Sequence, residues 1–403
     1  MKLLTFLGTG NYQETTYCWG DCCHTSCYCP AALVHFFHPV QTLVVVTEAS
    51  RAKHFDPLTA ELAAITQVTP VPIPEGKREG ELWAIFDALT DQFAEGDELI
   101  VDLTHGFRSL PFLSFLAVAY LRVAKRVNVA GVYYGAFDAR DQDANRTPVF
   151  DLTPFVTLLD WTIATDRFIV TGDARMLAEL MRQAELTRTA GEAAAKIRDV
   201  ASALFITSPI YVAKYSRVLD INLKKAETEL SQKMPPFSLL VERIRQSYAS
   251  FGAEKLLQDP TRLREHLRVQ LKMIRWYMEN QHIPQGLTLA REWLVTLTGY
   301  ALGQEIVLGA NARQPIENAL NAYMKRDEGL TDDKIWPAEL EPRVQALSFA
   351  KTLVDLWRDT ANLRNAIDHG FHDKSPQEPG AFVKKVQQLL PDLEELARLA
   401  LQD

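Results

Sequence analysis

Short apolar runs alternate with helical patterns along roughly the first 151 residues of the chain. Runs rich in β-branched residues predict five strands, at 2–8, 42–48, 68–74 as a weak edge strand, 98–104 and 127–135. Apolar residues at helical spacing predict helices between them, at 30–37, around 61–64, at 80–93 and at 110–123. This regular alternation predicts a mostly parallel sheet covered on both faces, an α/β Rossmann-like domain.

Beyond a polar, turn-rich stretch at 135–154, nearly all of the chain shows helical periodicity. One apolar stripe recurs every three or four residues, at Leu263, Leu267, Leu271, Ile274 and Met278. The last helical pattern, 381–402, predicts a pair of helices broken near Pro391. The sequence therefore predicts two domains, 1–153 with the parallel sheet and 154–403 with an all-α fold.

Composition limits the kinds of partner that the chain can have. Its 403 residues are 47% hydrophobic and 23% charged, which suits two domains with full cores. A net charge of -8 argues against a chain that coats nucleic acid over its whole surface, so any site for a polyanion is local. The first apolar run stops at Gly8 with no cleavage site after it, and the longest, 112–121, is shorter than the roughly 20 residues of a bilayer span. We expect no contact with a membrane.

All five cysteines lie within twelve residues, at Cys18, Cys22, Cys23, Cys27 and Cys29. An odd number without an export signal fits a reducing compartment better than a disulfide framework. Zinc is the sharper alternative, with His24 nearby, but the spacing matches no CxxC pair. We expect small apolar side chains and no metal site.

Two loops that follow predicted strands have the chemistry to bind an anion. Ligands of open parallel sheets lie at the carboxyl ends of the strands. After the first strand, two glycines let backbone N–H groups face an anion and a tyrosine can stack on a base. This loop is Gly8, Thr9, Gly10, Asn11 and Tyr12.

The second loop follows a buried strand and opens a helix, whose free N–H groups and positive dipole suit a phosphate. It consists of Thr104, His105, Gly106, Phe107, Arg108 and Ser109. The guanidinium of Arg108 can donate two parallel hydrogen bonds to a phosphate. Glu48 and Thr47, which end the second strong strand, are expected to line the same rim. Together the loops predict a nucleotide pocket, and the missing third glycine disfavours NAD or FAD. The plainer alternatives are a tight turn and a helix cap.

The stretch LRNAIDHG, residues 363–370, gathers an arginine, an asparagine and a histidine before a glycine that predicts the end of a helix. Its plain interpretation is a surface pair of Arg364 with Asp368 and a capping histidine. The alternative is RNA cleavage, in which His369 handles a proton and Arg364 stabilises the phosphorane. The two side chains point about 140° apart on an ideal helix. One site therefore needs an irregular helix end or a symmetric dimer.

A row of basic residues lies opposite the apolar stripe, at Arg264, Arg268, Lys272 and Arg275. It either guides RNA towards the LRNAIDHG stretch or is a solvated helix face.

Three motifs in this order carry a resemblance that spans the chain. GTGNY after the first strand, DLTHGFRSLP after a later strand and RN-x3-H in a C-terminal helical region resemble the CRISPR-associated ribonucleases of type III systems. These join an N-terminal CARF domain to a C-terminal HEPN-type domain. The cysteine-rich hairpin departs from that pattern.

The resemblance implies a CARF homodimer, or a higher assembly, that binds cyclic oligoadenylate and so activates cleavage of single-stranded RNA without a metal. It implies catalysis by Arg364, Asn365 and His369, and contacts to the ring from the two loops. Cyclic tetra-adenylate is the expected activator, hexa-adenylate the alternative, and the prokaryotic cytoplasm the expected location.

Two other functions remain open from the sequence. In one, the helical domain binds RNA or a protein and the chain is only a sensor. In the other, the first domain cleaves the cyclic nucleotide, with the hydroxyl of Thr9 or Thr104 positioning the phosphate. A redox or zinc switch at the cysteines is a more distant alternative.

Overall fold

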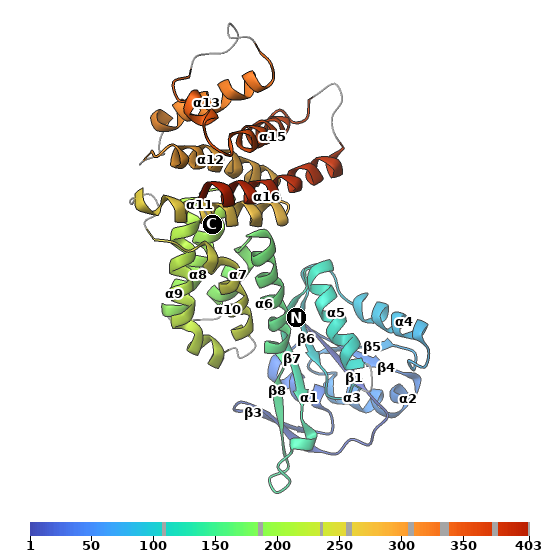
Figure 1. Cartoon of the computed structure of the whole chain (residues 1–403). Helices are drawn as coiled ribbons and strands as arrows, with labels where there is room; N and C mark the ends of the chain where they lie inside the picture. Colours follow the sequence, from blue (N-terminus) through green and yellow to red (C-terminus); the bar gives the residue numbers. More distant parts are fainter. Residues whose placement is uncertain are drawn as a thin grey trace. The chain divides into compact units, whose positions relative to one another are not determined.

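The computed structural model describes residues 1–106, 110–183, 188–233, 237–254, 260–304, 310–330, 338–372 and 378–401. The chain forms two compact units, an N-terminal unit of Met1–Leu159 and a helical unit of Asp160–Asp403 (Figure 1). The boundary predicted from the sequence falls after residue 153, where the helix α6 (Thr153–Thr171) begins. In the structure that helix starts in the first unit and continues into the second.

The described part of the N-terminal unit contains one sheet of eight strands in the order β3-β2-β8-β7-β6-β1-β4-β5. The strands are β1 (Lys2–Leu7), β2 (Thr15–Trp19), β3 (Cys22–Ser26), β4 (Gln41–Val46), β5 (Gln67–Pro72), β6 (Glu98–Asp102), β7 (Asn128–Gly135) and β8 (Arg146–Asp151). Only the β2–β3 and β7–β8 pairs are antiparallel. The predicted mostly parallel α/β fold is confirmed.

Helices cover both faces of the sheet. They are α1 (Cys29–Phe37), α2 (Glu48–Ser50), α3 (Asp56–Leu62), α4 (Glu79–Thr90) and α5 (Leu110–Ala124), and a π-helical turn, Arg51–Phe55, joins α2 to α3. Leu4 and Phe6 of β1 pack with α4 and α5, whereas Leu3 and Leu7 pack with α1 and α3. Successive side chains of a strand point to opposite faces, so a run of apolar residues supplies both cores at once.

The hairpin β2–β3 and the strand β8 extend the sheet where the sequence analysis expected polar turns or left the structure open. β8 pairs with β7 and with β2, so it joins the hairpin to the parallel core. It was missed because half of its residues are exposed and it carries Pro148, a residue that usually argues against a strand.

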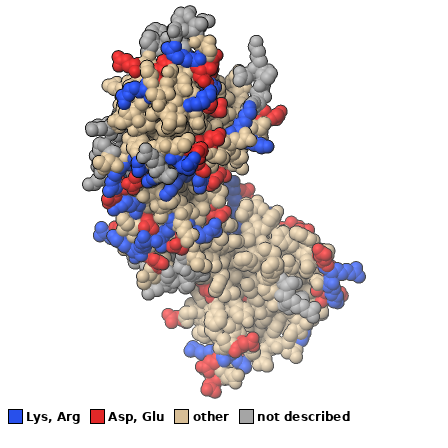
Figure 2. Space-filling view, viewed as in Figure 1, with Lys and Arg blue, Asp and Glu red and all other residues tan. Residues whose placement is uncertain are grey.

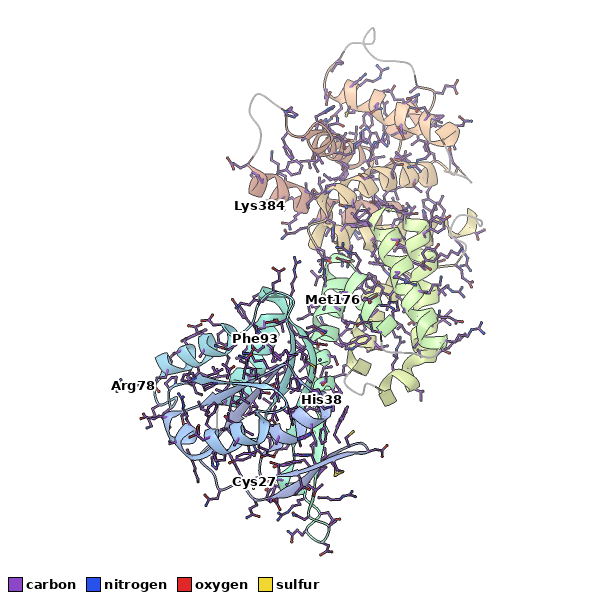
Figure 3. All side chains as sticks on the ribbon, turned by 180° about the vertical axis from the view of Figure 1, so that it is seen from behind. Cys27, His38, Arg78, Phe93, Met176 and Lys384 are labelled. Atoms are coloured by element: carbon purple, nitrogen blue, oxygen red, sulfur yellow. A yellow bond between two sulfur atoms is a disulfide. The ribbon has the colours of Figure 1, made fainter. Side chains whose placement is uncertain are left out.

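The cysteine cluster contains a disulfide. Cys18 and Cys23 are cross-strand partners in the hairpin, with their sulfur atoms 2.15 Å apart; Figure 3 labels Cys27, directly after β3. Cys22 is exposed and Cys29 is buried. The expectation of unbonded cysteines is therefore wrong for one pair, because the register sets Cys18 opposite Cys23. Among the described residues no group of three or more His, Cys, Asp and Glu is arranged to hold a metal ion.

The helical unit is all-α in its described residues, as predicted. After α6 it contains α7 (Arg175–Gln183), α8 (Arg188–Phe205), α9 (Pro209–Lys233), α10 (Phe237–Tyr248), α11 (Leu263–Glu279), α12 (Ile283–Ala301), α13 (Ala310–Asp327), α14 (Glu341–Gln345), α15 (Ala350–Asp368) and α16 (Pro379–Leu401). The predicted stripe of α11 is confirmed, since its Leu267, Ile274 and Met278 are fully buried in the core. No helix of the described residues is long and apolar enough to cross a membrane.

The last helix corrects the prediction of a helix pair. α16 runs unbroken from Pro379 to Leu401, with Pro391 inside it. A proline removes one backbone hydrogen bond, but Leu389, Leu393 and Leu396 on either side of it are buried in the core. Packing of this face holds the helix together across the proline.

His266 in α11 makes the helical unit sensitive to acid. Its side chain is buried, and burial lowers its pKa to about 4, with the charge of Arg313 acting in the same direction. The unfolded chain titrates near 6.5, so it takes up a proton before the folded chain does as the pH falls. Stability is therefore lost between about pH 6.5 and pH 4, by about 3 kcal/mol at most.

We expect His266→Gln to flatten this pH dependence, measured as urea unfolding of the full chain at pH 7.5 and pH 4.5. Gln270→Leu is the control, because it changes the packing one turn further on without removing a titrating group. Equal losses of stability in the native chain and His266→Gln would contradict the assignment.

Candidate functional site

The carboxyl ends of β1 and β6 lie side by side at the centre of the sheet. β1 has β4 on one side and β6 on the other, all parallel, so the strand order changes direction there. In doubly wound sheets, ligands bind in the crevice at such a switch point. Both predicted binding loops begin at this place, one after Leu7 and the other after Asp102.

The loop after β1 is held against the π-helical turn that follows α2. Lys53 donates to the carbonyl of Thr9 at 2.8 Å and to Oδ1 of Asn11 at 2.7 Å. Nε2 of His54 lies 2.8 Å from the carbonyl of Gly10. Two carbonyls of the loop are thus occupied by side chains of this turn, and one of these side chains is an exposed lysine.

Tyr12 folds back over its own loop. The backbone N–H of Gly8 donates to its hydroxyl at 2.7 Å. Its ring lies between two imidazoles, 4.3 Å from His54 and 4.1 Å from His105 between ring centres. The ring that was expected to stack on a base is thus stacked already, and the hydroxyl occupies an N–H group that an anion would use.

Asp102, the last residue of β6, links strand β1 to the loop that follows β6. Its buried carboxylate accepts from the hydroxyl of Thr5 at 2.7 Å and from the backbone and hydroxyl of Thr104 at 2.9 and 2.5 Å. The Thr104 hydroxyl in turn accepts from the backbone of Gly135 at 2.8 Å. Burial raises the pKa of Asp102, and the hydrogen bonds from Thr104 and Thr5 oppose that shift.

His105 reaches across from the β6 loop to the start of α1. Its Nε2 accepts from the backbone N–H of Cys29 at 3.3 Å. Desolvation lowers its pKa to about 3, and the charge of His54 contributes in the same direction. The ring is therefore neutral at physiological pH. The backbone N–H of Gly106, the next residue, donates a hydrogen bond to the carbonyl of Leu103 at 3.3 Å.

Four residues predicted to bind the ligand remain, Glu48 and the three residues 107–109. Glu48 is exposed at the first position of α2, where Thr47 caps the helix. Phe107, Arg108 and Ser109 lie outside the described residues. The assignment of these residues to a ligand stays a prediction.

Asp102 was predicted only as the first residue of the second loop, and its hydrogen bonds with Thr5 and Thr104 were not predicted. Lys53 and His54 were missed as members of this site, because they approach the loop only through the fold.

The LRNAIDHG stretch lies at the carboxyl end of α15. The N–H of Phe371 donates to the carbonyl of Ala366 and that of Gly370 to Ile367, both at 2.8 Å. Gly370 has a φ of +60°, so the helix ends in a Schellman motif, as the glycine predicted. His369 is the C-cap, with φ −91° and ψ 9°, and departs from ideal helix geometry.

The three predicted catalytic side chains lie on this helix end. Asn365 and His369 are exposed, and Arg364 is half-buried. Nε of Arg364 lies 3.0 Å from Oδ2 of Asp368, close enough for an ion pair, but its N–H is not aimed for a hydrogen bond. The guanidinium also reaches Oδ1 of Asn365 at 3.5 Å. Their catalytic role stays a prediction.

α15 is fixed firmly to its neighbours upstream of these residues. Leu353, Val354 and Trp357 are buried, and Nε1 of Trp357 donates to Asn321 of α13 at 2.9 Å. Lys351 and Arg358 both bind Asp327, whose pKa they lower. A helix anchored in this way presents its last turn in a defined position.

The basic row on α11 is partly used within the chain. Arg264 donates to the hydroxyl of Tyr300 at 3.0 Å, and Arg275 pairs with Glu394. Arg268 also has a partner, and Lys272 is exposed. The row therefore fits a helix face with internal ion pairs better than a continuous RNA track.

Three comparisons relate the chain to known proteins. The family model described as CRISPR-associated protein MJ1674, second domain, matches residues 157–252. The CRISPR-associated protein MJ1674 of Methanocaldococcus jannaschii is 24% identical over 217 residues, which are 53% of this chain and 31% of that protein. The chain thus spans about a third of that relative's length.

A solved structure, Enterococcus italicus Csm6 bound to cyclic hexa-2'-fluoro-hexa-dAMP, aligns with 99% of this chain and 93% of its own. The identity is 11% and the TM-score 0.40. The two sequence matches relate residues of this chain, 157–252 among them, to a CRISPR-associated protein.

Proposed function

We propose that the chain is an endoribonuclease of type III CRISPR antiviral defence, activated by cyclic oligoadenylate. In this proposal the N-terminal unit binds the ring and the helical unit cleaves single-stranded RNA without a metal ion. The observation that carries the proposal is the end of α15, where Arg364, Asn365 and exposed His369 lie together on an anchored helix.

The chemistry at this helix end is that of phosphodiester cleavage by an internal hydroxyl. The 2′-hydroxyl of the RNA loses its proton and attacks the neighbouring phosphorus, so that a 2′,3′-cyclic phosphate forms. The bond from phosphorus to the 5′-oxygen breaks, and the 5′-oxygen takes up a proton. His369 transfers one of these two protons, and water exchanges the other. The guanidinium of Arg364 stabilises the charge on the phosphorane, and Asn365 supplies an amide to orient the phosphate. Asp368 lies 3.0 Å from the guanidinium as an exposed partner of the ion pair.

The binding of the ring rests on the crevice at the carboxyl ends of β1 and β6. The N–H of Gly8 and the ammonium of Lys53 lie there with the rings of Tyr12 and His105. Adenine can replace one imidazole in the stack, and a phosphate can replace the tyrosine hydroxyl on Gly8. We take cyclic tetra-adenylate as the activator.

A homodimer of the N-terminal unit would make the site symmetric for a symmetric ring. The outward face of α5 is apolar and exposed at Phe112, Leu116, Tyr120 and Val123. Figure 2 shows a face of the N-terminal unit that is largely free of charged side chains. A second copy covering this face would shield it from water. We place the protein in the prokaryotic cytoplasm, where its RNA substrate lies.

The test is cleavage of a fluorogenic single-stranded RNA by the purified chain in EDTA, with cyclic tri-, tetra- and hexa-adenylate added separately. We expect cleavage with cyclic tetra-adenylate and little without it. If no ring produced cleavage while cyclic tetra-adenylate still bound, the proposed ribonuclease activity would be wrong. The result would favour a protein that only senses the ring. Loss of the ring itself on incubation would instead favour ring cleavage.

A further inference from the structure

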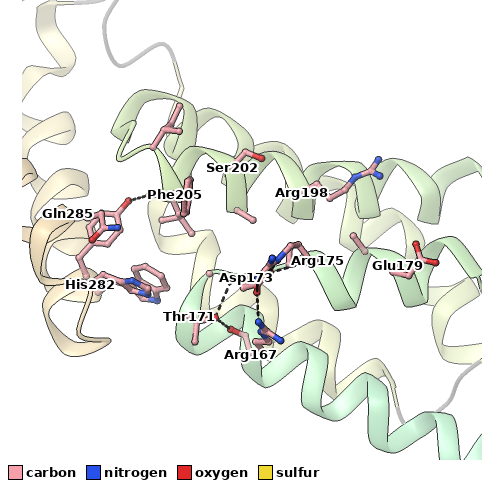
Figure 4. Close-up of a pocket in the computed structure, with 18 of the residues that line it drawn as sticks. Arg167, Thr171, Asp173, Arg175, Glu179, Arg198, Ser202, Phe205, His282 and Gln285 are labelled. Atoms are coloured by element: carbon pink, nitrogen blue, oxygen red, sulfur yellow. Dashed lines mark hydrogen bonds and ion pairs between the residues drawn. The ribbon is translucent and has the colours of Figure 1, made fainter. Parts of the chain in front are cut away.

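A pocket of about 1020 Å³ opens within the helical unit, far in sequence from LRNAIDHG (Figure 4). Its walls come from the end of α6, from α7 and α8, and from the turn between α11 and α12. All of its lining residues belong to the helical unit. Its volume is at the upper end of the range of about 300–1,000 Å³ found for small-molecule sites.

The floor of the pocket is apolar and aromatic. Small side chains such as Ala178 and Ala201 leave room beside Trp276 and Tyr277. Gly172 has a φ of +72°, and a Cβ there would approach the Trp276 ring to 3.2 Å. At the mouth, Phe205 is 82% exposed, which is costly for a large apolar ring without a partner. These residues form a surface suited to a flat apolar ring.

His282 adds a polar group to the aromatic wall. Its ring is stacked on Trp276, with 5.2 Å between ring centres and an interplanar angle of 14°. Its Nε2 is buried and has no hydrogen-bond partner among the described residues. Burial lowers the pKa of His282, and the backbone of Thr171 opposes that shift. His282 and Trp276 therefore form one stacked aromatic wall of the pocket.

The rim of the pocket is positively charged in a chain whose net charge is -8. Its charged residues are Arg167, Arg175, Arg182 and Arg198 against Asp173 and Glu179, a net charge of +2. Asp173 is shared by Arg167 and Arg175, each at 2.7 Å, so one carboxylate balances two guanidinium groups.

Arg198 on α8 is the group best able to meet an anion. It is exposed, and it forms no ion pair or hydrogen bond with any described residue. A guanidinium offers two parallel N–H groups to a phosphate, and no internal partner has to be displaced first.

We propose that this pocket binds a mononucleotide, with the base on the aromatic floor and the phosphate on the arginine rim. The walls match both chemical parts of the ligand. Trp276 and Phe205 can contact the flat base. Arg198 can bind the phosphate dianion, together with the excess positive charge of the two arginines that share Asp173. A peptide or a lipid chain would satisfy the floor but leave the arginines unmatched. The site is independent of the ribonuclease activity proposed above.

The test is isothermal titration calorimetry of the full chain with AMP, adenosine and inorganic phosphate in turn. We expect AMP to bind at one site per chain, and at least about tenfold more tightly than adenosine or phosphate, because both halves of the pocket are used. If phosphate bound as tightly as AMP, the arginine rim would hold an adventitious ion only and the proposal would be wrong. No binding of AMP at millimolar concentration would also overturn it.

Variants locate the bound AMP. We expect Arg198→Ala to weaken AMP binding by about tenfold through loss of a charge-assisted contact. Phe205→Ala should weaken it by about fivefold through loss of stacking. Arg188→Ala is the matched control, because it removes another exposed arginine of the same helix, paired with Glu192 outside the pocket.

Tyr12→Ala distinguishes this pocket from the crevice in the N-terminal unit. It should leave AMP binding unchanged, since Tyr12 lies in the other unit. Loss of AMP binding in Tyr12→Ala but not in Arg198→Ala would overturn the assignment. The pocket substitutions replace exposed side chains, so unchanged thermal melting should accompany them.

Discussion

His369→Ala should reduce activator-stimulated RNA cleavage by about a thousandfold, because general acid–base catalysis contributes roughly 10²–10⁴ to such reactions. The side chain is exposed beyond the last turn of α15. The Schellman contacts of this helix end use backbone groups only. The substitution should therefore leave folding and activator affinity unchanged. The measurement is the initial rate of fluorogenic RNA cleavage at saturating cyclic tetra-adenylate.

His372→Ala is the matched control, since it removes another exposed histidine three residues further on. We expect it to cleave within about threefold of the native rate, as for most surface substitutions. Cleavage by His369→Ala at the rate of this control would remove the histidine from the mechanism.

Asp368→Ala separates a catalytic arginine from a structural ion pair. Asp368 is exposed, and its pair with Arg364 is of a kind worth about 1 kcal/mol or less. If Arg364 acts on the phosphate, Asp368→Ala should retain most of the cleavage while Arg364→Ala loses it. Equal losses in both variants would indicate that the pair only shapes the helix end.

Local patterns in the sequence predicted most of the fold, because β1, β4, β6 and α5 each consist largely of one apolar run. The elements that were missed depend on pairing across the chain. Pro148 and exposed Phe150 make β8 look like a loop, yet the ladder with β7 and β2 holds it. Pro391 likewise looked like a helix end until the buried leucines around it were seen together.

The candidate site shows the same division. Gly370 predicted its own left-handed cap because a positive φ is a local property of glycine. The stacking of Tyr12 between His54 and His105 was not predictable, since those rings come from three separate segments. The disulfide also depends on register, which a cysteine count does not give.

Asp102→Ala should destabilise the N-terminal unit by about 2–6 kcal/mol, because it leaves buried donors without a partner at about 1–3 kcal/mol each. The donors include the hydroxyl of Thr5 and the backbone N–H of Thr104, both turned towards the carboxylate. Thr5 is fully buried, so its hydroxyl has no access to water, whereas Thr104 is half-buried. The measurement is urea unfolding of the full chain at pH 7.

Asp138→Ala is the control, an exposed aspartate of the same unit whose loss should change stability by no more than about 0.5 kcal/mol. Asp102→Asn, which keeps one acceptor oxygen, should fall between the two. Because the same carboxylate holds Thr104 at the crevice, we also expect Asp102→Asn to bind cyclic tetra-adenylate at least about tenfold more weakly than the native chain. Native affinity in that variant would mean that the crevice at β1 and β6 is not where the ring binds, and the sensing role would have to move elsewhere in the chain.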